Sequence, residues 1–584
     1  MPRFLSHPVV TPVAAFPHSG ASSIGEGSGM FQSLQRRPRN SASSEPRAPR
    51  GAGPIAPTGR KRGKLDVWLL GLTIVLGGQF FSWNAGLSAG LAGFGLAYAL
   101  VGAAYVLLCC CTAEISGMLP FAGGAYGLAR CTLGFTAGFL LGCCEALEYI
   151  AYVATTTLLL ADMIVAAAPS ARGLEPLIWL SFYASALALH LRGGRVFWAA
   201  NFLLGAVSLL VVIVFCVGAL AFLDLDGLRR DPHVGFVGGA SELLHVLPLA
   251  AWFFVGVEAL SMANDDVHAP RTTVPQAQVT CVLTLAVTGA AVLFVASAVP
   301  HAGGLQELAE TLAPLNAGFH AMFELPPASA TLLSIPATYA TAYGFMWCYG
   351  KLIRAMALSR LLPSWLARTS RRGKAPMAAL LAGAVVSYAL CVLVYVVPHL
   401  AKHLYSVCIL SAFVAYSGQC VGYIVLRRNY RLLAKSQYRN PFGYAGAVVS
   451  LVIWLLGIVA VAGFQGNGGV EALAFLAVVA VLALFYHGYA KKRQTFSPQE
   501  NAVLIVAHVA KFTVSRPTGR RSSASSGAST TRRSWHRRAQ GGVRRVARVQ
   551  PRTSQSLATS QPRSQNDDSD RSKVATTLHP TSQW

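Results

Sequence analysis

The chain has 584 residues, of which 54% are hydrophobic and only 12% charged, and its mean hydropathy is +0.48. That composition excludes a soluble globular protein with an ordinary solvated surface and predicts an integral membrane protein. The net charge of +25 is concentrated at the ends, because residues 1–64 carry +8 and residues 491–584 carry +14. Both ends are rich in Ser, Gly, Pro and Arg, so we predict two disordered tails around a membrane domain at residues 65–490.

The basic tails admit two interpretations. Clustered arginines can bind nucleic acid, but they also act as signals for cytoplasmic topology and can touch anionic lipid. We favour the second interpretation and expect no nucleic-acid partner. The twelve cysteines show neither a disulfide framework nor the spacing of a zinc site, so we expect no metal and no cofactor.

The membrane domain contains twelve apolar runs, each long enough to cross about 30 Å of hydrocarbon. In chain order they are Asp66–Ala89, Gly93–Leu119, Gly134–Ala168, Pro176–Leu191, Val196–Leu223, Leu243–Ala263, Pro275–Val299, Ser329–Gly350, Pro376–Val397, Tyr405–Leu426, Tyr444–Phe464 and Val470–Ala490. Twelve spans place both chain ends on one side, and the basic loops at 354–374 and 427–439 share that side. The positive-inside rule therefore predicts that both termini are cytoplasmic. We expect an all-α, multi-pass membrane protein and place it in the plasma membrane, although the loop charges do not identify the membrane.

Two spans carry glycines at corresponding depths. Gly77 and Gly78 lie about a dozen residues into the first span, and Gly256 lies at a similar depth in the sixth. This spacing predicts an inverted repeat of five plus five helices in which helices 1 and 6 are discontinuous. Breaks are tolerated at membrane depth only where the freed backbone groups line a cavity. The alternative is that these glycines merely let helices pack closely.

Acidic residues at membrane depth indicate the charge of a ligand. Glu145 and Glu148 lie three apart on one predicted helix, with Tyr152 on the same face, and Glu258 follows the glycine of the sixth span. We find no Lys or Arg at comparable depth, so a cavity there favours a cationic amine or a proton over an anion. The alternative is that these acids are protonated or hydrogen-bonded and hold helices together.

Two longer motifs stand out: "AEISGMLPFAGGAYGLAR" at Ala113–Arg130 and "WFFVGVEALSMANDDVHAPRTTVPQA" at Trp252–Ala277. The first resembles the signature after the second helix of the amino acid, polyamine and organocation permease superfamily, and the second resembles the sixth helix of that family and the loop that follows. The resemblance runs from about Leu65 to Ala490. "FFSWNAGLSAG" and "GCCEALEYIAYVATT" most resemble ethanolamine permeases and their amino acid transporter relatives.

The resemblance implies secondary transport by alternating access, with helices 1 and 6 lining the site. We therefore predict a permease for small amines or amino acids, with an ethanolamine-like substrate favoured and a coupling proton or sodium ion possible. Neutral or cationic amino acids are the alternative substrates, and a receptor that signals through its tails is the alternative function; no catalytic group is expected. The candidate substrate-binding residues are Gly77, Gly78, Gln79, Tyr152, Trp252, Phe253 and Gly256, the charge-balancing candidates are Glu148 and Glu258, and the secondary candidates are Asn84, Phe254 and Glu145.

One departure from the family pattern concerns the first break. The common Gly-Ser-Gly-type tripeptide, which meets the carboxylate of an amino acid, is replaced by Gly77, Gly78 and Gln79. The bulky third residue makes a standard α-amino acid carboxylate a poorer fit than a simple amine.

Overall fold

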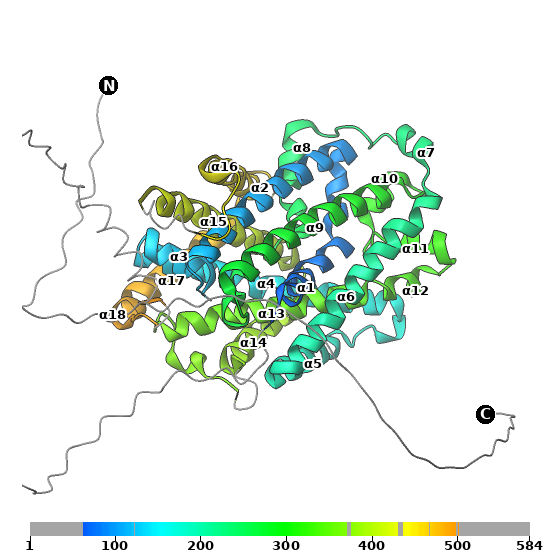
Figure 1. Ribbon diagram of the computed structural model, residues 1–584. Coiled ribbons are helices and arrows are strands. Elements are labelled where there is room, and N and C mark those ends of the chain that lie inside the picture. The colour runs from blue at the N-terminus through cyan, green and yellow to red at the C-terminus, as the bar shows by residue number, and fades with distance from the viewer. Residues whose placement is uncertain are drawn as a thin grey trace, which may run out of the picture. The chain divides into compact units, whose positions relative to one another are not determined.

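The computed structural model describes residues 62–121, 123–370, 375–429, 436–466, 468–497 and 500–501. Within these residues every regular element is helical, and the one extended pairing is an isolated bridge between Arg62 and Val267 (Figure 1). Nearly all of both tails, for which we predicted disorder, lies outside the described residues.

The helices follow one another with short connections. The first half contains α1 (Lys64–Val75), η1 (Leu76–Phe80), η2 (Trp83–Ala89), α2 (Gly90–Met118), α3 (Gly124–Thr132), α4 (Phe135–Ala167), η3 (Pro169–Ala171), α5 (Glu175–Arg192), α6 (Gly194–Gly218), η4 (Ala219–Phe222), α7 (Leu225–Arg230), α8 (Gly239–Val246), η5 (Leu247–Phe253) and η6 (Val257–Asp265). The second half contains α9 (Pro270–Ala298), α10 (Gly304–Glu310), α11 (Asn316–Phe323), α12 (Pro327–Leu332), α13 (Ile335–Leu358), η7 (Ser364–Ala367), α14 (Met377–Val396), α15 (Leu400–Asn429), α16 (Gly443–Gly463), α17 (Val470–Phe485), the π-helical turn η9 (Tyr486–Ala490) and α18 (Lys491–Arg493).

Nine segments of the described chain are long and apolar enough to cross a membrane. Three further spans that we predicted are too short in regular helix or not apolar enough to be counted among these nine. In the first, regular α-helix covers only the 12 residues of α1. The other two coincide largely with α5 and α13, which are 18 and 24 residues long but less apolar. The structure is therefore that of an all-helical, multi-pass membrane protein.

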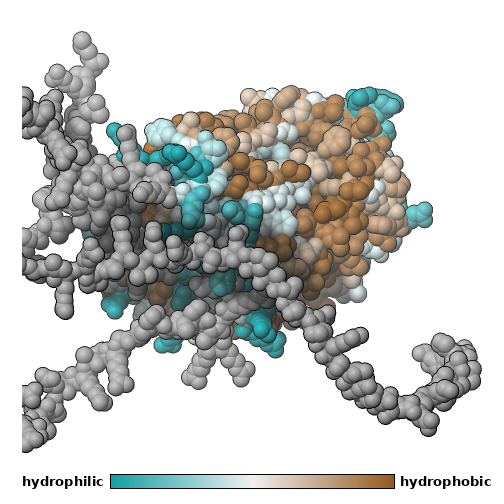
Figure 2. Space-filling model, viewed as in Figure 1, coloured by the Kyte–Doolittle hydropathy of each residue, from teal (hydrophilic) through white to brown (hydrophobic). Residues whose placement is uncertain are grey.

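The exterior of the helical domain is strongly apolar. Figure 2 shows hydrophobic side chains over much of the visible face, with polar side chains gathered mainly toward its margins. Val287, Val385 and Leu484 are each about 70% exposed, at 71%, 68% and 74%. In water such exposed apolar side chains would cost free energy and favour aggregation, whereas in contact with lipid tails they do not have to be hydrated. Lipid contact is therefore the environment that this surface fits.

The first helix lies at the centre of the domain. α1 packs against α6, α9 and α13, and α4 packs against α13 and α15. α2 and α9 run side by side along much of their length (Figure 1). Glycines allow several of these close approaches; a Cβ on Gly344 of α13 would lie 2.7 Å from the Cα of Ile74. This packing surrounds the two interrupted segments with helices.

The end of the described chain is tied to the helical domain by a buried ion pair. Arg130 Nη1 on α3 lies 2.5 Å from Glu500 Oε1, and the two side chains are 2% and 4% exposed. Glu500 also accepts hydrogen bonds from the Ser359 hydroxyl and from the backbone amide of Ser497. The guanidinium of Arg130 lies 5.0 Å from the ring centroid of Phe496. The segment after α18 is thus anchored on α3 and on the end of α13.

Candidate functional site

The first span leaves regular α-helical geometry after Val75. The chain continues through the 3₁₀ turn η1, becomes extended at Phe81 (φ −158°, ψ 156°) and enters the left-handed region at Ser82 (φ 65°). A left-handed non-glycine residue is strained. The carbonyl of Ile74, at the end of α1, accepts a hydrogen bond from Thr341 of α13. A neighbouring helix therefore satisfies a backbone group that the break would leave unpaired.

The sixth span breaks at Gly256. The 3₁₀ turn η5 ends at Phe253, Gly256 has a φ of 96°, and η6 begins at Val257. Glycine adopts this φ without the strain that a Cβ would add. The backbone amide of Gly256 donates to Glu258 Oε2 at 3.1 Å. One role of this buried carboxylate is therefore to satisfy an amide freed by the break.

The two breaks touch each other. A Cβ on Gly78 would lie 1.9 Å from the carbonyl oxygen of Trp252 and 3.2 Å from the Tyr152 hydroxyl. A Cβ on Gly77 would lie 2.4 Å from the carbonyl oxygen of Ala337. Neither glycine has a positive φ. Their small size is required for close approach of the backbones, while the left-handed turn of the first break lies at Ser82.

A cluster of carboxyl and phenol groups lies beside the breaks. The Tyr149 hydroxyl is placed to donate to Glu145 Oε1 at 3.1 Å and to Glu258 Oε1 at 3.0 Å. A phenol has one proton and can donate to only one of these oxygens at a time. The Tyr416 hydroxyl donates to Glu148 Oε1 at 2.5 Å. The cluster thus joins α4, η6 and α15 and leaves room for a proton to move between partners.

Aromatic rings close over this cluster. Trp252 stacks on Tyr405 with a centroid distance of 4.6 Å and an interplanar angle of 5°, and it meets the edge of Phe81 at 5.2 Å. Tyr152 stacks on Phe345 at 4.0 Å. Four of these residues, Phe81, Tyr152, Trp252 and Phe345, are at most 2% exposed, and Tyr405 is half-buried. The conformation described here is closed around the breaks.

Buried polar atoms remain unpaired at this place. Among the described residues, Glu148 Oε2, the Tyr152 hydroxyl and the indole nitrogen of Trp252 have no hydrogen-bond partner. No described Lys, Arg or His forms an ion pair with Glu148 or Glu258. Unpaired buried polar groups cost free energy and call for a ligand, water or ion. The carboxyl oxygen can accept a hydrogen bond and the indole N–H can donate one, so the arrangement can hold a small ligand that carries both a donor and an acceptor.

The other candidate residues lie around this centre and contact neighbouring elements, although Gln79 Oε1 and Asn84 Oδ1 are also buried without a hydrogen-bond partner. The Gln79 amide donates to Thr288 Oγ1 of α9 at 3.0 Å, and the Asn84 amide donates to the carbonyl of Leu308 at 2.7 Å. Phe253 packs edge-on against Tyr98 at 4.9 Å, and Phe254 stacks on Tyr105 at 5.4 Å. Seven of the candidate residues lie together at this centre: Gly78, Glu145, Glu148, Tyr152, Trp252, Gly256 and Glu258. Four others contact the elements around it, which are α9 for Gln79, α10 for Asn84 and α2 for Phe253 and Phe254.

Sequence reasoning missed several residues of the cluster. Tyr149 lies four residues after Glu145 on one helix face, so the i, i+4 rule could have found it. Tyr416 and Thr341 are separated from their partners Glu148 and Ile74 by 268 and 267 residues, and no local pattern marks them.

The apolar exterior and the buried polar centre define an integral membrane protein built around two interrupted helices. The family model described as "Amino acid permease" matches residues 67–501, most of the chain, so the chain belongs to that family. This confirms the resemblance inferred from the motifs. Membership makes the chain a multi-pass membrane transporter of amino acids or amines.

Curated relatives agree with this assignment. The chain is 24% identical over 444 residues to an uncharacterized transporter of Rhizobium meliloti (strain 1021), covering 73% of this chain and 91% of the relative. It is 25% identical over 462 residues to the lysine-specific permease LysP of Lactococcus lactis subsp. cremoris (strain MG1363), covering 73% and 88%. The histidine permease HisP of the same strain is 23% identical over 345 residues, covering 54% and 69%.

Proposed function

We propose that this protein is a secondary active transporter that carries a small organic amine, with an ethanolamine-like substrate favoured, by alternating access in the plasma membrane. The proposal includes twelve membrane-crossing helices, an inverted repeat of five plus five, and cytoplasmic termini. The observation that carries it is the contact of the two breaks at Gly78 and Trp252, beside the carboxyl groups of Glu148 and Glu258. Substrate sites at contacting helix breaks are a recurring design of transporters.

The charge of the site supports an amine. Glu148 Oε2 can accept a hydrogen bond from an ammonium group, and the aromatic rings of Trp252, Tyr152 and Phe345 pack together beside the breaks. Gly77, Gly78 and Gly256 contribute backbone to the site. In this proposal Gln79, Phe253, Phe254 and Asn84 shape the surrounding wall, because their contacts are with α9, α2 and the loop at α10.

Two alternatives remain testable. The substrate can instead be a neutral or cationic amino acid, since relatives of this chain are named as permeases for lysine, histidine and S-adenosylmethionine. The protein can also be a receptor that binds an amine and signals through its tails without transport. Both alternatives predict ligand binding, but only a transporter accumulates label inside sealed vesicles.

Coupling to an ion is a further part of the proposal, with a proton or sodium as the candidates. The shared phenol of Tyr149 provides a path on which a proton can be held between Glu145 and Glu258. When a cationic substrate binds next to Glu258, the Tyr149 hydroxyl would donate its hydrogen bond to Glu145 instead of Glu258. Substrate and proton would then be linked through one hydrogen-bond network.

Uptake of labelled ethanolamine into proteoliposomes tests the proposal. Competition by unlabelled choline, polyamines, lysine and histidine ranks the substrates. Binding of a panel member without its accumulation would favour the receptor, and strongest competition by lysine or histidine would favour the amino acid alternative.

A single variant tests the role of Glu258. We expect Glu258→Gln to reduce uptake or to abolish its dependence on external pH, while Glu310→Gln, which changes an exposed carboxyl group on α10, leaves both unchanged. Normal uptake by Glu258→Gln across the pH range would remove this residue from the mechanism.

A further inference from the structure

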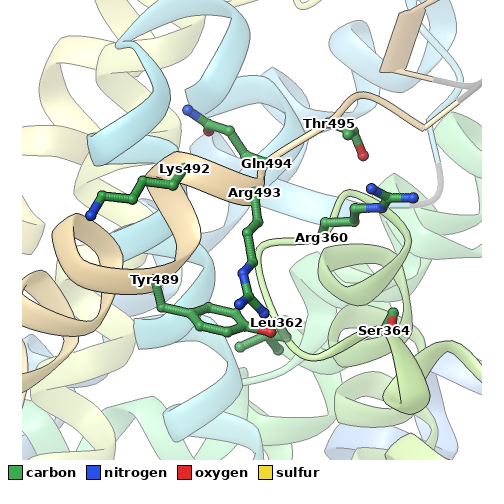
Figure 3. Close-up of a pocket in the computed structure, with 8 residues that line it drawn as sticks. All are labelled: Arg360, Leu362, Ser364, Tyr489, Lys492, Arg493, Gln494 and Thr495. Carbon is green, nitrogen blue, oxygen red and sulfur yellow. The ribbon is translucent and has the colours of Figure 1, made fainter.

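A second pocket lies away from the helix breaks, at the end of the helical domain where α18 meets the turn after α13. Its volume is about 580 Å³. Its lining comes from two segments distant in the sequence: Arg360, Leu362 and Ser364 on one side, and Tyr489, Lys492, Arg493, Gln494 and Thr495 on the other (Figure 3). None of the residues named as candidates for transport lines it.

The pocket is basic and carries no compensating acid. Three of its eight lining residues are Lys or Arg and none is acidic. Within the described part of the chain, Arg360, Lys492 and Arg493 form no ion pair. Glu500 is already committed to Arg130 and Ser359. The positive charge of the pocket is therefore available to an anion.

The side chains of the pocket offer donors in several directions. Figure 3 shows Arg493 projecting into the middle, toward Tyr489 and Leu362, while Lys492 and the guanidinium of Arg360 extend to opposite sides. The guanidinium of Arg493 lies 4.4 Å from the ring centroid of Tyr489, which holds it across the pocket. Ser364 and Thr495 add hydroxyl groups. Guanidinium and hydroxyl donors around one space match the oxygens of a phosphate group.

Two irregularities of the backbone coincide at this pocket. Arg360 is one of three described non-glycine residues with a positive φ, at 54°. Tyr489 belongs to the π-helical turn η9, which interrupts the regular helix between α17 and α18. Strained residues and π-helical turns both concentrate at functional sites. The anchor between Glu500 and Arg130 holds the segment after α18 in place, and the Thr495 amide donates to the carbonyl of Ser359 at 2.9 Å.

The surroundings indicate that the phosphate belongs to a lipid. α17 leads directly into the pocket and exposes Val481 and Leu484, at 65% and 74%, on its outer face. Trp365, in the turn η7 next to the pocket, is 51% exposed. A basic pocket at a helix end, next to an apolar helix face, fits a phospholipid whose head group enters the pocket while its acyl chains follow the helix.

We propose that this pocket binds the phosphate of an anionic phospholipid through Arg493, with Arg360 and Lys492 adding positive charge on opposite sides of its rim. The site is separate from the transport site, so its occupancy does not depend on which substrate the protein carries. A bound lipid would fasten the segment after α18 to the turn after α13. Anionic lipid would thereby stabilise the end of the helical domain from which the basic C-terminal tail leaves.

The full-length chain in neutral detergent tests this site by native mass spectrometry. The probes are dioleoyl phosphatidic acid, dioleoyl phosphatidylcholine and inorganic phosphate. The double variant Arg360→Asn/Arg493→Gln removes two charges, and Asn tolerates the left-handed backbone at position 360. The double variant Arg428→Gln/Lys491→Gln is the matched control, because it removes two exposed charges outside the pocket and keeps the tail.

We expect the pocket variant to bind phosphatidic acid at least about tenfold more weakly than the control variant, with little binding of phosphatidylcholine by any form. Equal binding by the two variants would overturn the proposal. Full displacement of the lipid by millimolar inorganic phosphate would show that a free anion is the occupant and would overturn the lipid assignment. Arg493→Gln alone provides the same comparison should the double variant not fold.

Discussion

The contact between the two helix breaks makes a sharp prediction at Gly78. In Gly78→Ala the new Cβ would lie 1.9 Å from the carbonyl oxygen of Trp252, well inside the 3.4 Å at which ordinary contact begins. The obstructing atoms belong to the backbone, so rotation of a side chain does not relieve the overlap. Overpacking a buried site costs about 1–3 kcal/mol, and we expect the upper end here, because one break must move away from the other.

The matched control is Gly95→Ala in α2. A Cβ on Gly95 meets nothing within 4 Å, and the residue lies inside a regular helix. Exchanging glycine for alanine there stabilises a helix by about 0.5–1 kcal/mol. Thermal or denaturant unfolding of both purified variants gives the difference in stability, and uptake into proteoliposomes gives its effect on transport. A Gly78→Ala protein as stable and as active as Gly95→Ala would refute the contact of the breaks.

Further predictions concern buried partners. Tyr416→Phe leaves Glu148 Oε1 buried without its donor, so we expect unfolding measurements to show a loss of about 1–3 kcal/mol, and an unchanged stability would contradict the bond. Glu500→Ala leaves Arg130 with a buried, unpaired charge, so the segment after α18 should detach and exchange its amide hydrogens faster, at a cost of about 3–5 kcal/mol to its docking. Burial, and secondly the negative charge of Glu500, raise the pKa of the Cys131 thiol to about 11. Glu500→Ala should therefore lower the pKa of Cys131 and accelerate its alkylation at pH 8, measured by peptide mass spectrometry. An unchanged rate would contradict both the detachment of the segment and the effect of the Glu500 charge.

Trp252→Ala addresses the aromatic cover of the transport site. Removing the indole takes away the ring face that stacks on Tyr405 and meets Tyr152, so we expect a higher apparent KM for uptake with a smaller effect on the maximal rate. Phe202→Ala, which changes an exposed aromatic residue in α6, is the control. Unchanged competition by every substrate in the Trp252 variant would argue against contact between this ring and the substrate.

The sequence by itself determined the class of the protein and the places where its helices are interrupted. Composition is enough for the first, because lipid-facing helices need apolar residues around most of their surface. The glycines at 77, 78 and 256 indicated where the interruptions lie, although the sequence left close helix packing as an alternative. In the structure Gly77 and Gly78 allow a close approach, and Gly256 has a positive φ. The membrane-depth acids were visible because a carboxyl group among apolar residues is conspicuous in any window.

Only the tertiary structure decided which groups meet. Gly78 lies against the backbone of Trp252, the Tyr416 hydroxyl donates to Glu148, and the Thr341 hydroxyl donates to the carbonyl of Ile74. Long stretches of chain separate the members of each pair. The tertiary structure also paired the side-chain amides of Gln79 and Asn84 with Thr288 of α9 and Leu308 of α10, partners that no local pattern indicates. The physical reason is that hydropathy and backbone preference act over a few residues, whereas the partner of a buried polar group is chosen by the packing of whole helices.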